Sequence, residues 1–391
     1  MKTVYVDNNA TTRVADEVLQ SMLPYFTEFY GNPSSMHSFG GNVALKIREA
    51  RTRVADLLGA NSEEIVFTSG GTESDFTAIN AAVRSNPDKR HLVTSRVEHP
   101  AVKTLMERYA KDGYRVTFVR VDGKGHLDLD ELYRSLSEDT AVVSLMWANN
   151  ETGVIFPVEE VAREVNARGI LFHTDAVQAV GKLPIRLYDA DIDLLSLSSH
   201  KLHGPKGVGV LYVRKGTKFT PLFVGGHQER GRRAGTENVA GIIGLGKAAE
   251  LAKERLGDMA GRVAGLRDRL EAGLLERVPE CRINGDPDKR LPNTSSIAFE
   301  FIEGEAILLR MNEFGICASS GSACTSGSLE PSHVLRALGV PFTAAHGSIR
   351  FSLSHYTTEA EIDFIIEKLP PIVSQLRKMS PFWKRKDSVA C

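Results

Sequence analysis

The chain has 391 residues, enough for about two or three domains and a large hydrophobic core. Its 48 lysine and arginine residues balance 49 aspartate and glutamate residues, and the net charge of -1 favours neither nucleic acid nor an anionic membrane as a partner. No apolar stretch reaches the roughly 18 residues that span a bilayer, and the first residues, MKTVYVDNNATT, lack the apolar run of a signal peptide. We therefore expect a cytoplasmic protein.

The first two-thirds of the chain alternate short apolar runs with amphipathic stretches. Amphipathic patterns predict helices at 44–60 and 73–85. Continuous runs of Val, Ile and Leu separated by helices are typical of a mainly parallel sheet covered on both faces. We therefore predict an α/β domain, with ligand groups just beyond the strand ends. The predicted strands are 63–69, 91–95, 114–121, 140–148, 169–175, 193–199 and 207–214.

The pattern changes from about residue 239. Two helical patterns, 239–256 and 259–278, follow each other almost directly. Strand patterns at 294–301 and 347–354 and a helix at about 303–314 come after them. We predict a large domain over 13–259, a smaller αβ domain over 260–391, and an N-terminal segment, 1–12, that packs with the smaller domain.

The cysteines are too few for a disulfide framework, and none forms the CxxC pair of a zinc site. We expect free thiols at Cys281, Cys317, Cys324 and Cys391. Glycine and serine flank Cys324 on both sides in SSGSACTSGS, a composition typical of a mobile loop. Cys324 is therefore the cysteine that we expect to be most exposed and reactive.

Polar residues follow several of the predicted strands. Gly70 and Gly71 precede Thr72 at the start of a helix, where backbone N–H groups and the helix N-terminus attract an anion. This pattern alone is also that of an ordinary capped turn. His99 follows the next strand and stands before Pro100.

Further strand ends carry Asn149, Asn150, Asp175 and Lys201. Asp175 follows a buried strand, and a carboxylate there needs a cationic or hydrogen-bonding partner. Gln178 lies three residues later, on the same side of a helical turn. Lys201 ends another apolar run, in LSLSSHKLHGPKG. We expect these groups to meet at one edge of the sheet.

This set of groups suits pyridoxal phosphate. That cofactor needs a lysine for covalent attachment, an acid that keeps its ring nitrogen protonated, a phosphate cup and a flat group over the ring. Lys201, Asp175, the Gly71–Thr72 turn and His99 supply these groups in that order. Burial would lower the lysine pKa and make Lys201 a usable nucleophile and base.

The resemblance to a known family rests on ten motifs that occur in order along nearly the whole chain. They are DNNATT, YGNPSSMH, TSGGTES, EHPAV, NNETG, DAVQ, SSHKLHGPKG, RRAGTEN, SSGSACTSG and GSIRFSLS. In these motifs the chain closely resembles the cysteine desulfurases, which are class V, fold-type-I pyridoxal-phosphate enzymes. The resemblance implies that fold, with a large domain built on a mainly parallel seven-stranded sheet and a smaller αβ domain.

The resemblance also implies roles for the matching residues around the ring. Lys201 would bind the cofactor and shuttle protons at the substrate Cα. Asp175 would pair with the ring nitrogen, and Gln178 would hydrogen-bond the ring hydroxyl. His99 would stack on the ring and act as an acid–base group.

The phosphate would lie against Gly71, Thr72, Ser198 and His200. Thr236, in RRAGTEN, would reach it from the neighbouring subunit, which implies an obligate homodimer.

Arg350, with Asn150 at the same cofactor and substrate site, would clamp the substrate carboxylate, a task suited to the planar arginine fork. By the same resemblance, the Cys324 thiolate would attack the sulfur of cofactor-bound L-cysteine, so that L-alanine leaves and Cys324 carries a persulfide. A thiol with an ordinary pKa of about 8.5 is mostly protonated at neutral pH, so Cys324 needs a base or cation beside it.

The loop and the termini indicate a subtype. The length of the cysteine loop resembles that of the group that hands sulfur to an iron–sulfur scaffold protein. KTVYVDNNATT and the short ending SPFWKRKDSVAC are most similar to the nitrogen-fixation form, which supplies sulfur for iron–sulfur cluster assembly in nitrogenase maturation. The family also implies that Cys324 ligates a transient [2Fe-2S] cluster during transfer.

Three other functions stay open. Another enzyme of the same fold, such as a transaminase or a selenocysteine lyase, would share Lys201 and Asp175 but not need Cys324. A sulfur carrier would use Cys324 and leave Lys201 unexplained. A zinc hydrolase would use His99, His173, His200 and His203, but the Gly-Pro after His203 breaks any helix that would hold the last two as a ligand pair.

Overall fold

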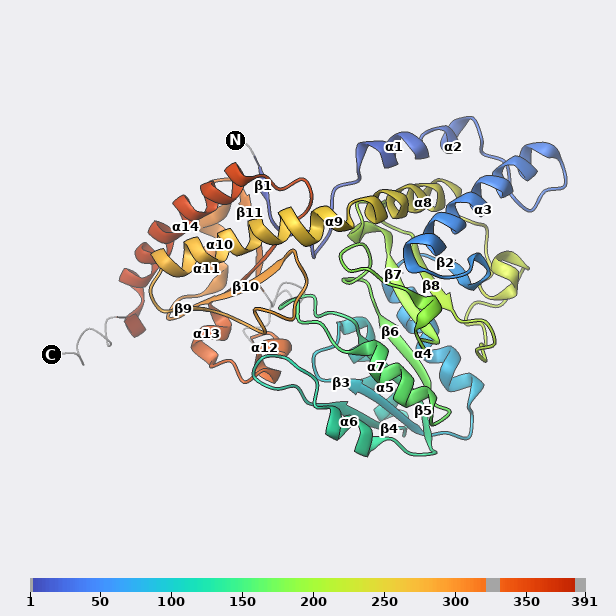
Figure 1. Cartoon of the computed structure of the whole chain (residues 1–391), viewed down its shortest axis with the longest axis horizontal. Helices are drawn as coiled ribbons and strands as arrows, with labels where there is room; N and C mark the ends of the chain where they lie inside the picture. Colours follow the sequence, from blue (N-terminus) through green and yellow to red (C-terminus); the bar gives the residue numbers. More distant parts are fainter. Residues whose placement is uncertain (1–2, 321–330, 384–391) are drawn as a thin grey trace.

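The structure is a computed structural model that describes residues 3–320 and 331–383. Two units lie side by side, the larger built on a seven-stranded sheet and the smaller on a four-stranded sheet (Figure 1). Across these described residues, no helix combines the length and apolar character required to cross a bilayer. This arrangement is the α/β fold that the sequence predicts.

The seven-stranded sheet has the order β2-β8-β7-β6-β5-β3-β4. β8 runs antiparallel to both of its neighbours, and the other neighbouring pairs are parallel. Each strand lies within a predicted range, so the prediction of a mainly parallel sheet is confirmed. The strands are β2 (Ile65–Thr68), β3 (His91–Ser95), β4 (Arg115–Val119), β5 (Thr140–Met146), β6 (Leu171–Asp175), β7 (Leu194–Ser198) and β8 (Gly209–Val213).

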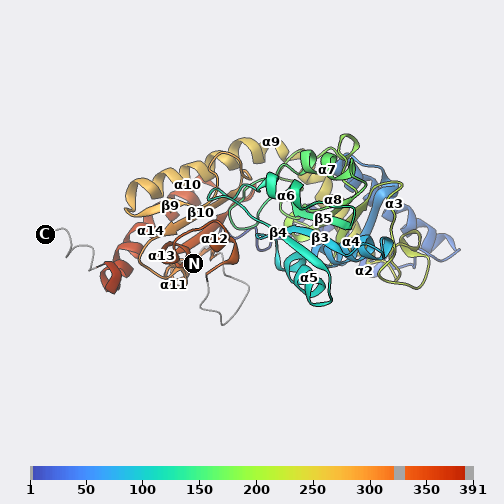
Figure 2. The same cartoon turned by 90° about the horizontal axis from the view of Figure 1, so that it is seen from below.

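Helices cover both faces of this sheet because consecutive strand residues point to opposite sides. Leu92 packs with α4 (Gly71–Ser85) and α5 (Pro100–Lys111) on one face. Its neighbour Val93 belongs to the main core on the other face, with α7 (Val158–Asn166). Figure 2 shows α5 and α7 on opposite sides of the strands.

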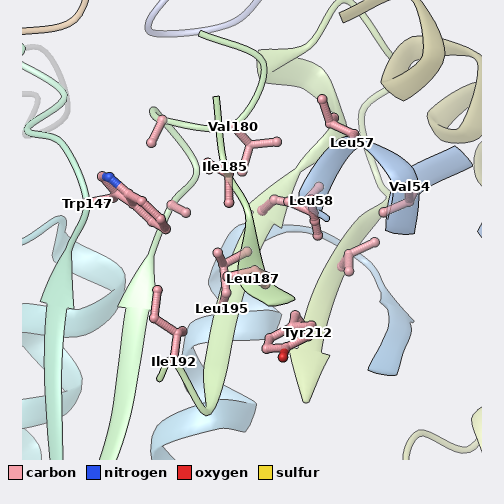
Figure 3. Packing of buried hydrophobic residues seen from close by; sticks show 14 of the residues in the cluster. Val54, Leu57, Leu58, Trp147, Val180, Ile185, Leu187, Ile192, Leu195 and Tyr212 are labelled. Carbon is pink, nitrogen blue, oxygen red and sulfur yellow. The ribbon is translucent and has the colours of Figure 1, made fainter. Parts of the chain in front are cut away.

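The main core joins the sheet to α3 (Ser38–Leu58), α8 (Val239–Glu254) and α1 (Asp16–Met22). Val54 and Leu58 of α3 belong to the same buried cluster as Leu195 and Tyr212 of the sheet (Figure 3). α3 begins six residues before its predicted start, because the His37 side chain accepts a hydrogen bond from the Gly40 N–H and caps the helix there. The remaining helices of the larger unit are α2 (Pro24–Thr27) and α6 (Leu129–Ser135).

The smaller unit has the sheet order β12-β13-β10-β9, with helices α10, α11 and α14 packed into its own core. A short helix and one wide helical turn, α9 (Leu256–Asp258) and Met259–Val263, connect it to α8. Its elements are β9 (Cys281–Ile283), β10 (Thr294–Phe299), β12 (Ser319–Ser320), β13 (Ser348–Ser352), α10 (Ala264–Arg277), α11 (Gly304–Asn312), α12 (His333–Ala337), α13 (Phe342–His346) and α14 (Glu359–Met379).

The N-terminal segment runs from the smaller unit to the larger one. β1 (Val4–Tyr5) pairs in parallel with β11 (Ile316–Cys317), and Val4 and Val6 lie in the core of the smaller unit. A few residues later, the Thr12 N–H donates to the His200 carbonyl of the larger unit (3.0 Å). Residues 7–12 therefore lie between the two units, and the domain boundaries drawn from the sequence stay a prediction.

Candidate active site

A cavity of about 590 Å³ lies where the carboxyl ends of β5, β6 and β7 face the smaller unit. Met146, Asp175 and Ser198 end these three strands, and all three line the cavity. Parallel strands bring their carboxyl ends to the same edge of a sheet, which is why residues far apart in the sequence meet here. The predicted site residues that line it are Gly71, Thr72, His99, Asn150, Asp175, Gln178, Ser198, His200, Lys201 and Arg350.

The start of α4 forms one wall of the cavity. A Cβ atom added to Gly71 would lie 2.8 Å from Val177 Cγ2, so only glycine lets this turn pass so close to the strand-end loop. The Glu73 carboxylate holds the turn by accepting from the Ser69 N–H and pairing with Arg233, at 2.9 Å each. Unpaired N–H groups and the helix dipole make this helix start a suitable place for a phosphate group.

Lys201 ends a short 3-10 turn that directly follows β7. Its Nζ donates to the carbonyl oxygens of Asn9 (2.5 Å) and Ala10 (2.8 Å). Both acceptors belong to the N-terminal segment, which crosses the cavity edge at this point. Backbone carbonyls therefore orient the amine that the sequence predicts to bind the cofactor.

Asp175 is buried at the end of β6, where its Oδ1 accepts from the Val177 N–H (2.9 Å). Burial raises the pKa of this carboxyl, whereas His99, the Val177 N–H and Lys201 lower it. Asp75, on α4, is also buried, and burial followed by the nearby Asp175 charge raises its pKa well above the usual range. A cationic ring nitrogen beside Asp175 would favour the charged form of this carboxyl group.

His99 caps the start of α5. Its Nδ1 accepts from the Ala101 N–H (3.2 Å), which leaves the proton of the neutral ring on Nε2. Burial lowers the pKa of His99, Asp175 opposes this effect, and Lys201 adds to it. A neutral imidazole at the cavity wall is suited to accept or relay a proton.

His200 and Gln178 are also held by the N-terminal segment. The His200 Nδ1 lies 3.1 Å from Thr11 Oγ1, and burial, with Lys201 and Lys206 nearby, lowers the pKa of His200 to about 4. The Gln178 Nε2 donates to the Asn9 carbonyl (3.0 Å). Both side chains are therefore neutral polar groups with a defined orientation.

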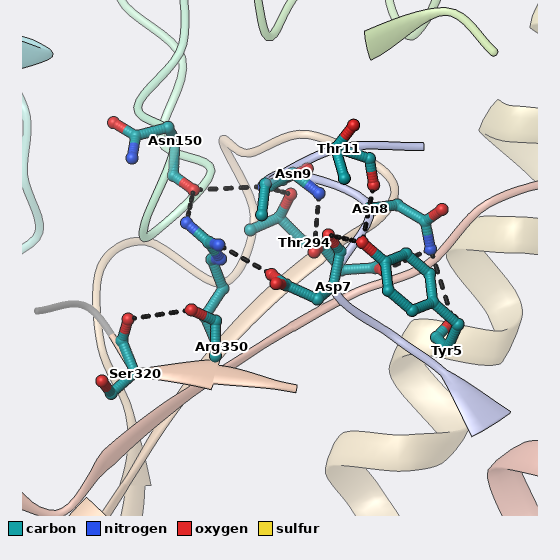
Figure 4. Close-up of polar contacts among 12 residues, drawn as sticks. Tyr5, Asp7, Asn8, Asn9, Thr11, Asn150, Thr294, Ser320 and Arg350 are labelled. Atoms are coloured by element: carbon teal, nitrogen blue, oxygen red, sulfur yellow. Dashed lines mark hydrogen bonds and ion pairs between the residues drawn. The ribbon is translucent and has the colours of Figure 1, made fainter. Parts of the chain in front are cut away.

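Arg350 approaches the cavity from β13 of the smaller unit (Figure 4). Its Nη1 donates to the Asn150 carbonyl (3.1 Å), and its Nη2 pairs with Asp7 Oδ1 (2.8 Å). Its buried Nε has no hydrogen-bond partner among the described residues. Arg350 lines the cavity, and the planar fork of a guanidinium suits a carboxylate.

Two predicted site residues are not in this group. Thr236 lines a separate cavity of about 160 Å³, together with Ser69, Arg233 and Gly235, and so lies outside the site of its own chain. Cys324 lies outside the described residues. On either side of its segment, Ser320 and Pro331 line the large cavity.

Several residues near the cavity have no role predicted from the sequence. Asn9 lies in the motif DNNATT and contacts both units, through Asn150 and Thr294. Glu98, next to His99, and Glu151, which lines the cavity, are both buried, and burial raises their pKa values to about 8 and about 7. The consecutive polar residues after an apolar start were a usable signal for Asn9. Glu98 and Glu151 lie in the motifs EHPAV and NNETG, but nothing in the sequence shows that they are buried.

The histidines considered as zinc ligands have other partners. His173 is buried in β6 between Ser144 (2.8 Å) and Ser196 (3.0 Å), and His203 Nδ1 lies 3.0 Å from the Arg13 carbonyl. Within residues 3–320 and 331–383, no group of three or more His, Cys, Asp or Glu side chains could hold a metal ion. The geometry of the described residues therefore gives a zinc hydrolase no support.

The described residues fit pyridoxal phosphate. The glycine turn at α4 would receive the phosphate, the buried Asp175 would face the ring nitrogen, and Lys201 lies at the same cavity.

Comparisons with known proteins agree with this fit. Residues 4–365 match the family Aminotransferase class-V. The chain is 62% identical to the protein named "Cysteine desulfurase NifS" from Azotobacter vinelandii over 384 residues, which are 98% of this chain and 96% of that protein.

Two solved structures are similar to more than nine-tenths of the chain. One is titled "NIFS-LIKE PROTEIN", with a TM-score of 0.90, 42% identity and coverage of 96% of this chain and 100% of that one. The other, "SspA in complex with cysteine", has a TM-score of 0.80, 34% identity and coverage of 91% of this chain and 100% of that one. The chain therefore belongs to the class-V aminotransferase family of pyridoxal-phosphate enzymes and, within that family, to the cysteine desulfurases.

Proposed function

We propose that this protein transfers the sulfur atom of L-cysteine to its own Cys324 and releases L-alanine. One observation carries the proposal: a single cavity brings together Lys201, Asp175, His99 and Arg350, from four separate segments. When bound, pyridoxal phosphate withdraws electrons from the substrate Cα and so weakens the bonds around it.

Each residue of the site then has a separate role in binding or in proton transfer. Arg350 binds the substrate carboxylate, and Asp175 keeps a proton on the ring nitrogen of the cofactor. Lys201 binds the cofactor and moves the proton at the substrate Cα, while neutral His99 accepts or returns a proton beside it. Gly71, Thr72, Ser198 and His200 bind the phosphate, and Asn150 supports Arg350 through its carbonyl.

The sulfur transfer needs no oxidant or reductant besides L-cysteine and the Cys324 thiolate. The Cys324 thiolate forms a bond to the substrate sulfur, the bond between that sulfur and the substrate Cβ breaks, and the carbon fragment takes up a proton to become alanine. The products are alanine and a persulfide on Cys324. The positions of Ser320 and Pro331 at the cavity support delivery of Cys324 to it.

The acceptor of this sulfur is, in our proposal, an iron–sulfur scaffold protein that serves nitrogenase maturation. The 62% identity to the NifS desulfurase supports this subtype. Cys324 would also ligate a transient [2Fe-2S] cluster during the transfer, a role that rests on the family resemblance alone.

We further propose a homodimer in which Thr236 completes the phosphate site of the partner. The placement of Thr236 outside its own chain's cavity supports this. So does a run of exposed apolar side chains on and after α1 and α2, because surfaces of this kind mark interfaces. These side chains are Leu19, Leu23, Phe26, Phe29, Tyr30 and Met36.

The test is to incubate the purified protein with L-cysteine, measure alanine, and locate the persulfide by mass spectrometry. We expect alanine and a mass increase of one sulfur atom on Cys324. Borohydride treatment should fix the cofactor to Lys201 and not to another lysine. A protein without a cofactor absorbance band would contradict the proposal.

A matched variant separates this activity from that of related enzymes. Cys324→Ala should keep the cofactor absorbance and lose alanine formation from cysteine, whereas Cys317→Ala should keep both. Retained alanine formation in Cys324→Ala would identify the chain as a different pyridoxal-phosphate enzyme of the same fold.

A further inference from the structure

Lys182 is a buried lysine with no part in the chemistry described above. It is 7% exposed and follows Asp175 in a loop made of two consecutive turns, closed by hydrogen bonds from Val180 to Ala176 and from Leu183 to Ala179. Burial, with Lys201 and Arg350 nearby, lowers its pKa well below the ordinary value. A buried amine is costly, and an apolar residue would avoid that cost.

The contacts of Lys182 are with amide oxygens. Its Nζ donates to Gln178 Oε1 at 2.7 Å and to Asn9 Oδ1 at 3.4 Å. The other end of the Gln178 amide, Nε2, donates to the Asn9 carbonyl at 3.0 Å. The Gln178 amide therefore has an acceptor for its nitrogen and a donor for its oxygen, and both hydrogen bonds favour the same orientation.

One N–H group of the Gln178 amide remains available to a ligand. A glutamine amide has one oxygen and two N–H groups. The oxygen accepts from Lys182, and one N–H donates to Asn9. The second N–H is the donor left over at the cavity that Gln178 lines.

Lys182 itself is not at that cavity. It lines a separate space of about 40 Å³ with Lys201 and His203, and it is absent from the lining of the large cavity. Any effect of Lys182 on a molecule in the large cavity therefore passes through Gln178 or through charge.

We infer that Lys182 is a positioning residue that holds the Gln178 amide with its N–H, and not its carbonyl, toward the ring oxygen of the bound cofactor. The inference rests on the proposed function, since it requires pyridoxal phosphate attached to Lys201. Without the Lys182 amine, Gln178 Oε1 loses its hydrogen-bond donor, and the amide can rotate so that its oxygen and nitrogen exchange places.

The orientation has a measurable consequence. A donor stabilises the form of the bound cofactor in which the ring oxygen is negative and no proton remains on the adjacent lysine linkage. It therefore lowers the pH at which that linkage loses its proton, whereas a carbonyl oxygen facing the ring raises it.

The experiment is a pH titration of the cofactor absorbance band, with the protein as purified and without substrate. Lys182→Met keeps the length of the side chain and removes the donor. We expect its midpoint to lie about half a pH unit to one unit above that of the unsubstituted protein, the size of one neutral hydrogen bond. An unchanged midpoint would overturn the inference.

A double-mutant cycle separates orientation from charge. In a Gln178→Leu background, Lys182→Met should produce no further shift, because it acts through the amide. An equal shift in both backgrounds would show that Lys182 acts by its own charge, and would also overturn the inference. If Lys182→Met does not fold, Lys182→Leu, which also has no donor, takes its place in the cycle, with the same expected direction.

Asn293→Ala is the matched control. The Asn293 Nδ2 donates to the same Asn9 Oδ1 (3.2 Å) from the smaller unit but does not contact Gln178. We expect it to leave the midpoint in place, and a shift as large as that of Lys182→Met would assign the effect to Asn9 instead. Failure of borohydride to fix a cofactor on Lys201 of the unsubstituted protein would contradict the proposed function itself, which is a separate outcome.

Discussion

Individual ionisable side chains around the cavity have pKa values set mainly by burial. Glu98 is fully buried, its Oε1 accepts from Ser95 Oγ (2.6 Å) and the Met146 N–H (3.1 Å), and its Oε2 has no partner among the described residues. Burial raises the pKa of Glu98 from 4.5 to about 8, and the Ser95 hydrogen bond offsets part of this. Glu98 therefore carries a proton at neutral pH and behaves as a neutral polar group.

A pH dependence of stability follows from Glu98. Below pH 4.5 both the folded and the unfolded chain bind its proton, whereas between pH 4.5 and about 8 only the folded chain does. Raising the pH through this window therefore costs stability, about 1.4 kcal/mol for each pH unit. Glu98→Gln mimics the protonated acid and should lose this slope, so that it is more stable than the unsubstituted protein at pH 8.5.

Thermal unfolding of both proteins at pH 5.5, 7 and 8.5 measures the difference. Glu138→Gln, in an exposed loop, is the control and should reproduce the unsubstituted protein at each pH. Parallel pH profiles for Glu98→Gln and the unsubstituted protein would disprove the assignment.

At the scale of elements, the close approach of β8 to the turn before α4 shapes the phosphate site. Gly209, the first residue of β8, pairs with Thr68 on one side and Ser198 on the other. A Cβ at this position would lie 2.7 Å from the Gly70 Cα and 2.7 Å from the Leu197 carbonyl oxygen. These are backbone atoms, which cannot turn aside as a side chain does.

Gly209→Ala should therefore displace the Gly70–Gly71 turn, weaken cofactor binding and destabilise the fold by about 1–3 kcal/mol, the usual cost of overpacking. Cofactor titration of the stripped protein, with the unfolding temperature, measures both effects. Gly265→Ala in α10 is the control, since a Cβ there meets no atom within 4 Å. Cofactor affinity equal to that of the unsubstituted protein in Gly209→Ala would show that the turn does not depend on this contact.

At the scale of the whole molecule, the proposed dimer links oligomeric state to cofactor binding. Phe26 (61% exposed) lies in α2, and Tyr30 (71% exposed) follows this helix. α1 and α2 extend along the outside of the larger unit in Figure 1. Charges at both positions would oppose burial against a second copy.

The double variant Phe26→Glu, Tyr30→Glu should sediment as a monomer and bind the cofactor more weakly, because Thr236 of a partner is then missing from the phosphate site. Phe342→Glu is the control, since Phe342 is similarly exposed (68%) but belongs to α13 of the smaller unit. A dimer of the double variant, or a monomer with full cofactor affinity, would contradict the link.

The strands of the larger sheet, the α/β class and the residues at the strand ends can be predicted from the sequence alone. This is possible because continuous apolar runs and the polar residues that end them are local properties of the chain. Asp175, Ser198 and Lys201 were recognisable as strand-end groups before any of their neighbours in space were known.

Which of these groups meet, and what surrounds them, depends on the packing of the whole chain. Three contacts depend on how separate segments of the chain pack. They are the hydrogen bonds from Lys201 to the N-terminal carbonyls, the pairing of Arg350 with Asp7, and the hydrogen bond from the buried Lys182 to Gln178. Burial likewise sets the pKa values of Glu98 and Asp75, because desolvation depends on the atoms that surround a carboxyl group and not on its sequence neighbours.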